Sequence, residues 1–153
     1  QWFIDNCNLN QFNGSLSECM VGTDIFIGVS APNVLSENDI KSMAPNAIVF
    51  ALANPDPEID PEIARKYATV VATGRSDHPN QINNVLAFPG IFRGLLDSGV
   101  NKISDEMLVA AAIAISNCVQ NEHLNSSYII PSVFDSQVAS SVAEAIRKFA
   151  TTN

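Results

Sequence analysis

The fold is decided by Ala72-Thr-Gly-Arg-Ser-Asp-His-Pro-Asn-Gln-Ile-Asn-Asn-Val-Leu-Ala-Phe-Pro-Gly-Ile-Phe-Arg-Gly94. This stretch begins at the end of an apolar run, passes through a polar loop, and ends in an apolar segment, Val85–Leu96, that predicts a helix. Ligands of α/β proteins bind outside the carboxyl ends of parallel strands, where such loops lie. Two adjacent amides, Asn83 and Asn84, stand where the helix would begin. They suit either a polar, uncharged part of a ligand or the cap of the helix.

The same alternation of strand, loop and helix extends toward the N-terminus. Nearly continuous apolar runs predict three buried strands, at Asp24–Ser30, Ala47–Leu52 and Ala68–Thr73. Capping residues and prolines predict the helices Ser15–Val21, Glu37–Met43 and Pro61–Lys66. Strands that alternate with helices at this spacing indicate right-handed βαβ crossovers and a parallel sheet. We therefore expect an α/β, Rossmann-like fold.

After residue 85 the sequence predicts helices only. They are Val85–Ser98, kinked or broken near Pro89, then Asp105–Asn121, capped by Ser104, and a last helix capped by Asp135 that ends near Ala150. The apolar faces of the last two comprise Met107, Leu108, Ala111, Ile115 and Val119, and Val138, Val142, Ala145, Ile146 and Phe149. With about three strands and no Gly-x-Gly-x-x-Gly, residues 1–153 correspond to a single domain that is the second half of a Rossmann-like domain with closing helices.

Composition excludes several classes of protein. A chain of 153 residues with 46% hydrophobic residues can form a core, and its net charge of -8 argues against a nucleic-acid surface. Three cysteines without a CxxC pair make a disulfide or zinc framework improbable and favour a reducing, cytoplasmic compartment. No apolar run is long enough to span a membrane.

Small or polar residues follow each predicted strand, and parallel strands bring these ends to one edge of the sheet. Asn54 can bind a carboxamide, hydroxyl or carboxylate, or it can form an Asx turn before Pro55. Ser30 more often serves as a turn residue. Asp56 and Glu58 are a possible metal pair, but two carboxylates in a loop are usually solvated.

The remaining polar residues offer little chemistry. Arg75 can clamp an anion but more often forms a surface salt bridge. His78 and His123 lack the spacing of a metal site, and no serine lies in a Gly-x-Ser-x-Gly elbow. The sequence thus contains no convincing general base, nucleophile or metal cluster.

Three long blocks of the sequence resemble the cofactor-binding domain of malic enzymes, most closely the shorter bacterial type. They are Gly22-Thr-Asp-Ile-Phe-Ile-Gly-Val-Ser-Ala-Pro32, Ile48-Val-Phe-Ala-Leu-Ala-Asn-Pro-Asp-Pro-Glu58 and the stretch from Ala72 to Gly94 quoted above. The resemblance extends to the closing Tyr128-Ile-Ile-Pro-Ser132 and the last helix.

This resemblance implies oxidative decarboxylation of L-malate to pyruvate and CO2, with NAD or NADP and with Mg2+ or Mn2+. It implies that Ser30, Asn54 and Asn83 bind the cofactor and that Asn54 and Asn84 bind the substrate. It also implies a homo-oligomeric enzyme, commonly a dimer. Uncharged amides fit these roles, since they can hold a carboxamide and a carboxylate while a metal carries the charge chemistry.

The chain departs from the family pattern in one large respect. The family's catalytic tyrosine and lysine, its metal-binding carboxylates and its Gly-rich phosphate loop have no counterpart here, and no catalytic or metal residue is assigned. We expect the C-terminal portion of an NAD(P)-binding domain that is inactive alone. Two alternatives stay open: a non-catalytic nucleotide-binding or regulatory module, and a related amino-acid or folate dehydrogenase.

Overall fold

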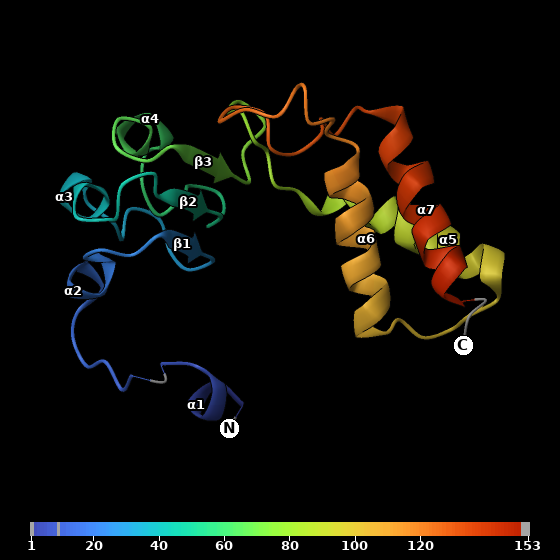
Figure 1. Cartoon of the computed structure of the whole chain (residues 1–153), viewed down its shortest axis with the longest axis horizontal. Coiled ribbons are helices and arrows are strands. Elements are labelled where there is room, and N and C mark those ends of the chain that lie inside the picture. Colours follow the sequence, from blue (N-terminus) through green and yellow to red (C-terminus); the bar gives the residue numbers. More distant parts are fainter. Residues whose placement is uncertain (1, 9, 151–153) are drawn as a thin grey trace. The chain divides into compact units, whose positions relative to one another are not determined.

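The computed structural model describes residues 2–8 and 10–150, and it forms two compact units that divide between Val71 and Ala72 (Figure 1). Each unit is described by itself below. The prediction that residues 1–153 make a single domain stays a prediction. Among the described residues, no helix is both long and apolar enough to cross a bilayer.

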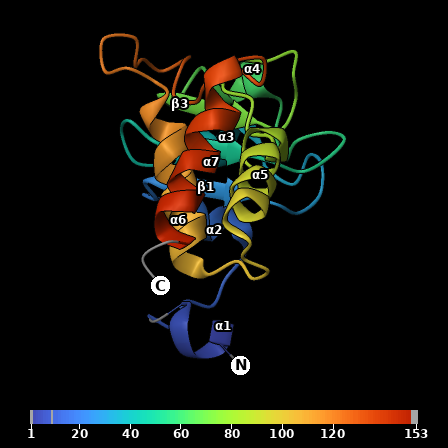
Figure 2. The same ribbon diagram turned by 90° about the vertical axis from the view of Figure 1, so that its right-hand side faces the viewer.

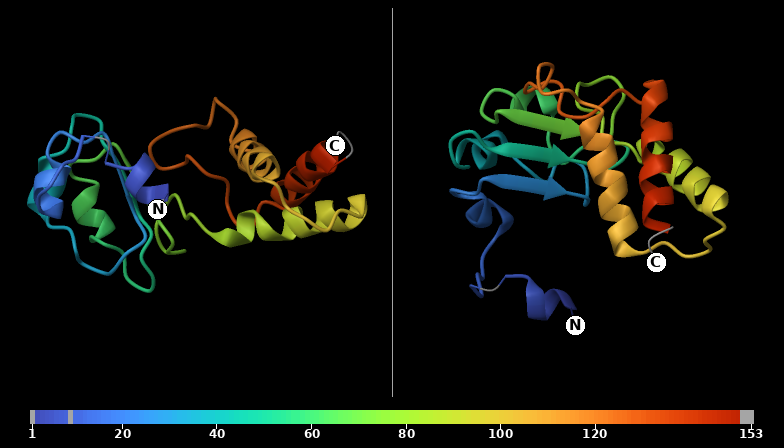
Figure 3. Two further views of the ribbon diagram at one scale, coloured as in Figure 1. Left: turned by 90° about the horizontal axis from the view of Figure 1, so that it is seen from below. Right: turned by 45° about the vertical axis from the view of Figure 1, so that its right-hand side comes forward.

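The first unit is built around a parallel sheet. Its elements are α1 (Trp2–Asn6), α2 (Leu16–Met20), β1 (Ile25–Gly28), α3 (Glu37–Lys41), β2 (Ile48–Ala51), α4 (Pro61–Ala64) and β3 (Val70–Thr73), the last of which spans the dividing point. The strand order is β1-β2-β3, and β1 pairs with β2 in parallel, with Ile25 opposite Ile48 and Gly28 opposite Ala51. The right-hand view of Figure 3 shows the three strands pointing the same way. This confirms the predicted three-stranded, Rossmann-like sheet.

Short polar signals set the helix ends of this unit. Ser15 and Glu18 form a reciprocal capping box at α2, and Ser36 and Asp39 form another at α3. The Asp60 side chain accepts from the Glu62 N–H at the start of α4, where Pro61 stands at the first helical position. Each cap satisfies backbone donors that a helix start leaves unpaired. The sequence-based prediction of these three helices is therefore confirmed, with shorter ends.

One expectation about the strands is wrong. β1 is not a buried strand: Ile25 is 55% exposed, Ile27 is 64% exposed, and Val29 just beyond the strand is 79% exposed. β1 lies at the edge of the described sheet, whereas β2, between two strands, buries Val49 and Ala51 completely. An apolar run therefore marked the strand correctly but not its burial. The core of this unit consists of Met20, Leu35, Ile40, Met43, Ala47, Val49, Ala51, Ile59, Ala64, Ala68 and Val71.

The second unit is helical. It contains the short 3-10 helix η1 (Asn84–Leu86), then α5 (Phe88–Ser98), α6 (Asp105–Asn117) and α7 (Ser136–Ala150). Figure 2 shows the three long helices of this unit. The predicted helix from Val85 is broken at Ala87, and α5 starts just before Pro89, which lacks the N–H that a helix interior needs. Gly99, with a φ of 65°, ends α5.

The buried faces of α6 and α7 differ in part from those predicted. Leu108 is 48% exposed and Phe149 is 39% exposed, and Ala145 is half-buried. α6 instead buries Met107, Ala110 and Ala111, and α7 buries Val138, Val142, Ala143 and Ile146. The buried positions of the two helices thus include alanines, whereas the larger Leu108 and Phe149 stay partly exposed.

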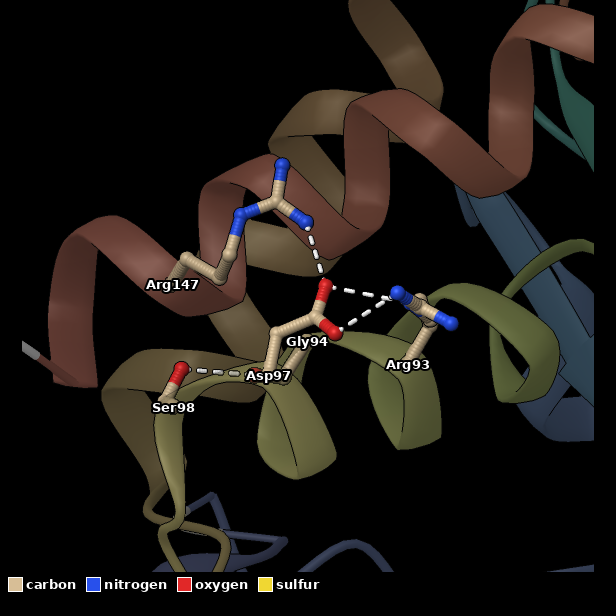
Figure 4. A network of polar contacts seen from close by, with 5 residues as sticks. All are labelled: Arg93, Gly94, Asp97, Ser98 and Arg147. Carbon is tan, nitrogen blue, oxygen red and sulfur yellow. Dashed lines mark hydrogen bonds and ion pairs between the residues drawn. The ribbon is translucent and has the colours of Figure 1, made fainter.

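Two glycines bring α5 directly against α7. A Cβ at Gly90 would lie 2.5 Å from the Cβ of Val142, and one at Gly94 would lie 2.6 Å from the Cβ of Ile146. Asp97 of α5 also forms an ion pair with Arg147 of α7, which joins the two helices, and a second pair with Arg93 of its own helix, each with an N–O distance of 2.9 Å (Figure 4). Exposed pairs of this kind contribute little to stability, so the close packing of the helices is the main attachment.

Candidate functional site

The turns that follow β1 and β2 are held by one buried carboxylate, that of Glu58. Its Oε1 accepts from the Ser30 N–H at 2.8 Å and from the Ser30 hydroxyl at 3.1 Å, and its Oε2 accepts from the Ala53 N–H at 3.0 Å. The backbone adds two bonds nearby, from the Asn33 N–H to the Pro57 carbonyl and from the Leu35 N–H to the Glu58 carbonyl. The structure therefore fixes two predicted site residues, Ser30 and Asn54 (next to Ala53), relative to each other.

Glu58 corrects the expectation that the loop carboxylates are solvated. Its side chain is 0% exposed, whereas Asp56 is exposed as predicted. Burial opposes ionisation of Glu58, yet hydrogen bonds from Ser30 and Ala53 favour the charged form and hold the pKa below its usual value. The sequence contained one weak indication that Glu58 is buried. It lies near apolar residues, just after an aspartate, Asp56, that has a proline on each side.

Asn54 presents its amide to the outside of the turn. It is exposed, although Ala53 before it is buried, and the Asn54–Pro55 peptide bond is cis. Within the described part of the chain its side chain makes no hydrogen bond, so the alternative of an Asx turn is not realised. The amide is thus available to a ligand.

In the second unit, the loop after β3 is anchored at several points. The Ile82 N–H donates to the Thr73 carbonyl at 2.8 Å, and the Arg75 N–H donates to the buried Thr73 hydroxyl at 3.1 Å. Asn80 is buried and has a φ of 58°; its Nδ2 donates to the Ser126 carbonyl and its Oδ1 accepts from the Ile129 N–H. Asn80 thereby ties the loop to the connector before α7.

Replacing Asn80 by alanine should destabilise the second unit by about 1–2 kcal/mol, because both backbone partners lose a bond and alanine disfavours a positive φ. The change should be visible as faster amide exchange at Ile129. Asn33, which is exposed and has a φ of 56°, gives the control: its side chain makes no hydrogen bond among the described residues, so its alanine variant carries the backbone cost alone. Equal losses in the two variants would remove the hydrogen bonds from the explanation.

The two adjacent amides have different roles. Asn83 is the N-cap of η1, and its Oδ1 accepts from the Val85 N–H at 3.0 Å. Asn84 is exposed, and its side chain makes no hydrogen bond within the described part of the chain. The capping interpretation is therefore confirmed for Asn83, and a ligand contact by Asn84 stays a prediction.

The other polar candidates behave as surface groups. Arg75 pairs with Asp77 at 2.6 Å, and this hydrogen bond is the main cause that lowers the pKa of Asp77 to about 2. This is the surface salt bridge expected for Arg75. No cluster of three or more histidine, cysteine or acidic residues among the described residues could hold a metal ion. The described residues therefore offer neutral donors and acceptors, which fit a nicotinamide carboxamide and hydroxyl groups but do not form a metal site.

A hollow of about 830 Å³ lies between α6 and α7. None of the predicted site residues lines it, and its walls include the exposed apolar side chains Val109, Ile113 and Phe149. Because no predicted site residue contributes to its lining, this hollow is not the candidate site.

Comparison with known proteins gives consistent matches over most of the chain. A family model described as the malic enzyme NAD-binding domain matches residues 12–151. The chain is 58% identical over 146 residues to an NAD-dependent malic enzyme of Geobacillus stearothermophilus, covering 95% of this chain and 30% of that protein. It is 51% identical over 144 residues to a bifunctional malic/malolactic enzyme of Bacillus subtilis, covering 94% and 35%. The chain thus spans about a third of the length of these relatives.

Solved structures agree. The NAD-dependent malic enzyme from Thermotoga maritima superposes with a TM-score of 0.86 at 46% identity, covering 92% of this chain and 36% of that one. The malic enzyme from Pyrococcus horikoshii gives a TM-score of 0.88 at 44% identity, covering 95% and 34%. The fold and the ordered sequence blocks point to the same family.

Proposed function

This chain belongs to the malic enzyme NAD-binding domain family, and from that premise we propose that it is a portion of a longer malic enzyme. The full-length protein would convert L-malate to pyruvate and CO2 while it reduces NAD or NADP. The observation that carries this proposal is 58% identity to an NAD-dependent malic enzyme across 95% of the chain. Relatives named as NADP-dependent also match, at up to 43% identity, so the choice of dinucleotide stays open.

The residues of this chain would bind and orient the reactants. We assign the exposed amide of Asn54 to contacts with both the nicotinamide and the substrate. Ser30 and the Nδ2 of Asn83 would contact the cofactor. Asn84 would donate to a carboxylate of malate, since its amide has no partner within the described part of the chain. The bound cofactor supplies the hydride acceptor. Neutral amides suit this task because they orient an anion without adding a charge that must be neutralised.

Proton transfer and metal binding are assigned outside this chain. The described residues contain no group of three or more histidine, cysteine or acidic side chains that could hold a metal ion. We therefore place the Mg2+ or Mn2+ ligands and the catalytic acid and base in the remainder of the protein, and we expect residues 1–153 alone to be inactive.

A direct assay tests this function. The full-length protein should reduce NAD or NADP only when L-malate and a divalent cation are present, with pyruvate formed in equal amount. Residues 1–153 prepared alone, as the matched control, should give no malate-dependent reduction. Cofactor binding without turnover by the full-length protein would favour the regulatory module instead, and turnover by residues 1–153 alone would contradict the assignment of the catalytic groups.

We also propose that the full-length protein is a homo-oligomer, in the simplest case a dimer. Support comes from the resemblance to the family and from the apolar side chains that β1 leaves exposed in the first unit. A mass measurement in solution by light scattering should give twice the chain mass or more, and a monomer at assay concentration would contradict this part.

A further inference from the structure

Glu58 is the feature of the first unit that the proposed function does not use. It is among the largest fully buried side chains, and its carboxylate accepts three hydrogen bonds from two different turns. Those turns follow neighbouring parallel strands, β1 and β2, and each holds one residue that we assign to the cofactor or substrate. A carboxylate buried for packing alone would be costly, because an apolar side chain would fill the same space without desolvating a charge.

The backbone makes room for this carboxylate. A Cβ at Gly28 would lie 2.5 Å from both Cδ and Oε1 of Glu58. Gly28 is the last residue of β1, two positions before Ser30, so the strand ends in the residue type that lets the carboxylate reach the turn. Any side chain here would push Glu58 out of the position from which it holds Ser30.

We infer that Glu58 is a positioning residue, which sets the placement of Ser30 and Asn54 in the reactive site without touching either ligand. This role rests on the proposed malic enzyme function. The carboxylate fixes the Ala53 N–H and the Ser30 N–H and hydroxyl, and these groups in turn fix the exposed Asn54 amide and the Ser30 turn. The orientation of Ser30 and Asn54 affects the rate of reaction, because a small misplacement of binding groups raises the free energy of the transition state.

The substitution Glu58→Gln tests this role directly, because it changes the hydrogen-bonding capacity of the side chain but hardly its size. An ionised carboxylate accepts at both oxygens, whereas an amide accepts at one end and donates at the other. Both ends of Glu58 face donors, so Glu58→Gln must leave either the Ser30 pair or the Ala53 N–H facing an NH2 group. If the glutamine oxygen faces Ser30, the two hydrogen bonds from Ser30 are kept and the one from the Ala53 N–H is lost. Glu58→Gln should therefore loosen the turn that carries Asn54.

Asp39 provides a matched control in the same unit. It is also a buried carboxylate, and its Oδ2 accepts from the Ser36 N–H and the Ser36 hydroxyl, each at 2.7 Å. It caps α3 and lies in no turn that carries an assigned site residue. Asp39→Asn makes the same change from carboxylate to amide at a buried position outside the site, and it reports the effect of lost stability alone.

The experiment measures malate-dependent NAD(P) reduction by the full-length protein. Glu58→Gln should lower kcat/KM about five- to twentyfold, with a larger change in kcat than in the binding of reduced cofactor followed by fluorescence. Gly28→Ala should change the kinetics in the same direction. Asp39→Asn should leave both constants within twofold of wild type at a temperature where all variants are folded. Folded Glu58→Gln protein with wild-type constants, or equal losses in Glu58→Gln and Asp39→Asn, would overturn the role.

A second measurement needs no variant. In the wild-type protein the amide protons of Ser30 and Ala53 should exchange with solvent at least tenfold more slowly than that of Asn54. If the amide protons of both Ser30 and Ala53 exchanged fast, the hydrogen bonds to Glu58 would not hold in solution. This result would overturn the role of Glu58 even if Glu58→Gln fails to fold. A wild-type protein that is inactive with malate would refute the proposed function and the role that rests on it. An active wild-type protein with an unaffected Glu58→Gln variant would refute the role alone.

Discussion

Replacing Gly94 by alanine should lower the free energy of unfolding of the second unit by about 2 kcal/mol. The new Cβ would lie 2.6 Å from the Cβ of Ile146 and 2.8 Å from the carbonyl oxygen of Ala143. These atoms belong to the frame of α7 rather than to a flexible side-chain tip, so α5 and α7 must move apart. Overpacking costs about 1–3 kcal/mol, and a clash with atoms this rigid belongs at the upper end, about 3 kcal/mol. Alanine in place of helical glycine returns about 1 kcal/mol, which leaves a loss of about 2 kcal/mol.

The double variant of Gly90 and Gly94 should lose about 3 kcal/mol, which is less than twice the single loss. Both glycines face α7, so one shift of the helix relieves both clashes and the effects are not additive. A loss of this size is a large part of the stability of an ordinary domain. Amide exchange along α5 and α7 is the measurement, because it reports this unit separately.

Gly74→Ala is the matched control for this prediction. The nearest atom to a Cβ at Gly74 is the Ile82 carbonyl oxygen at 3.9 Å, an ordinary contact, so this variant should be nearly neutral. If Gly94→Ala and Gly74→Ala had equal stabilities, the close approach of α5 to α7 would not hold in solution.

The sequence predicted the secondary structure well where a local signal defines it. Ser15, Ser36 and Ser104 each cap the helix that was expected to follow, because an N-cap bond involves only residues two or three positions apart. The break near Pro89 follows from the missing N–H of proline in the same way. Such signals do not depend on the rest of the fold.

Burial was predicted less well, because it depends on neighbours far along the chain. The apolar run of β1 suggested a buried strand, yet burial requires a second strand on each side and cover on both faces. Leu108 fits a helical stripe by spacing, but α6 buries Met107, Ala110 and Ala111 instead. No pattern within a single element carries this information.

The same contrast between local signals and distant contacts applies to the candidate site. Asn54, Asn83 and Asn84 were found from their position after strands and before a helix, and the structure separates the capping amide from the free one. Glu58 was missed because its three donors come from residues 5 and 28 positions away in sequence. Only the fold brings them to one carboxylate.

In the full-length enzyme, Asn84→Ala should lower kcat/KM for malate by about 5- to 150-fold, which corresponds to the 1–3 kcal/mol of a lost buried hydrogen bond to a charged group. Stability should change by no more than about 0.5 kcal/mol, because the Asn84 side chain makes no hydrogen bond within the described part of the chain. Steady-state kinetics with malate varied at saturating cofactor gives the first quantity, and thermal unfolding gives the second.

Two further variants separate a substrate contact from a cofactor contact. Asn84→Asp places a negative charge beside the malate carboxylate and should be worse than alanine, whereas near a neutral carboxamide it should be milder. Asn83→Ala should instead lose the cap of η1, at a cost of about 0.5–2 kcal/mol of stability, and Asn83→Ser should retain it. If kcat/KM for malate were unchanged in Asn84→Ala, the carboxylate would have to be held by another residue, and Asn84 would leave the site.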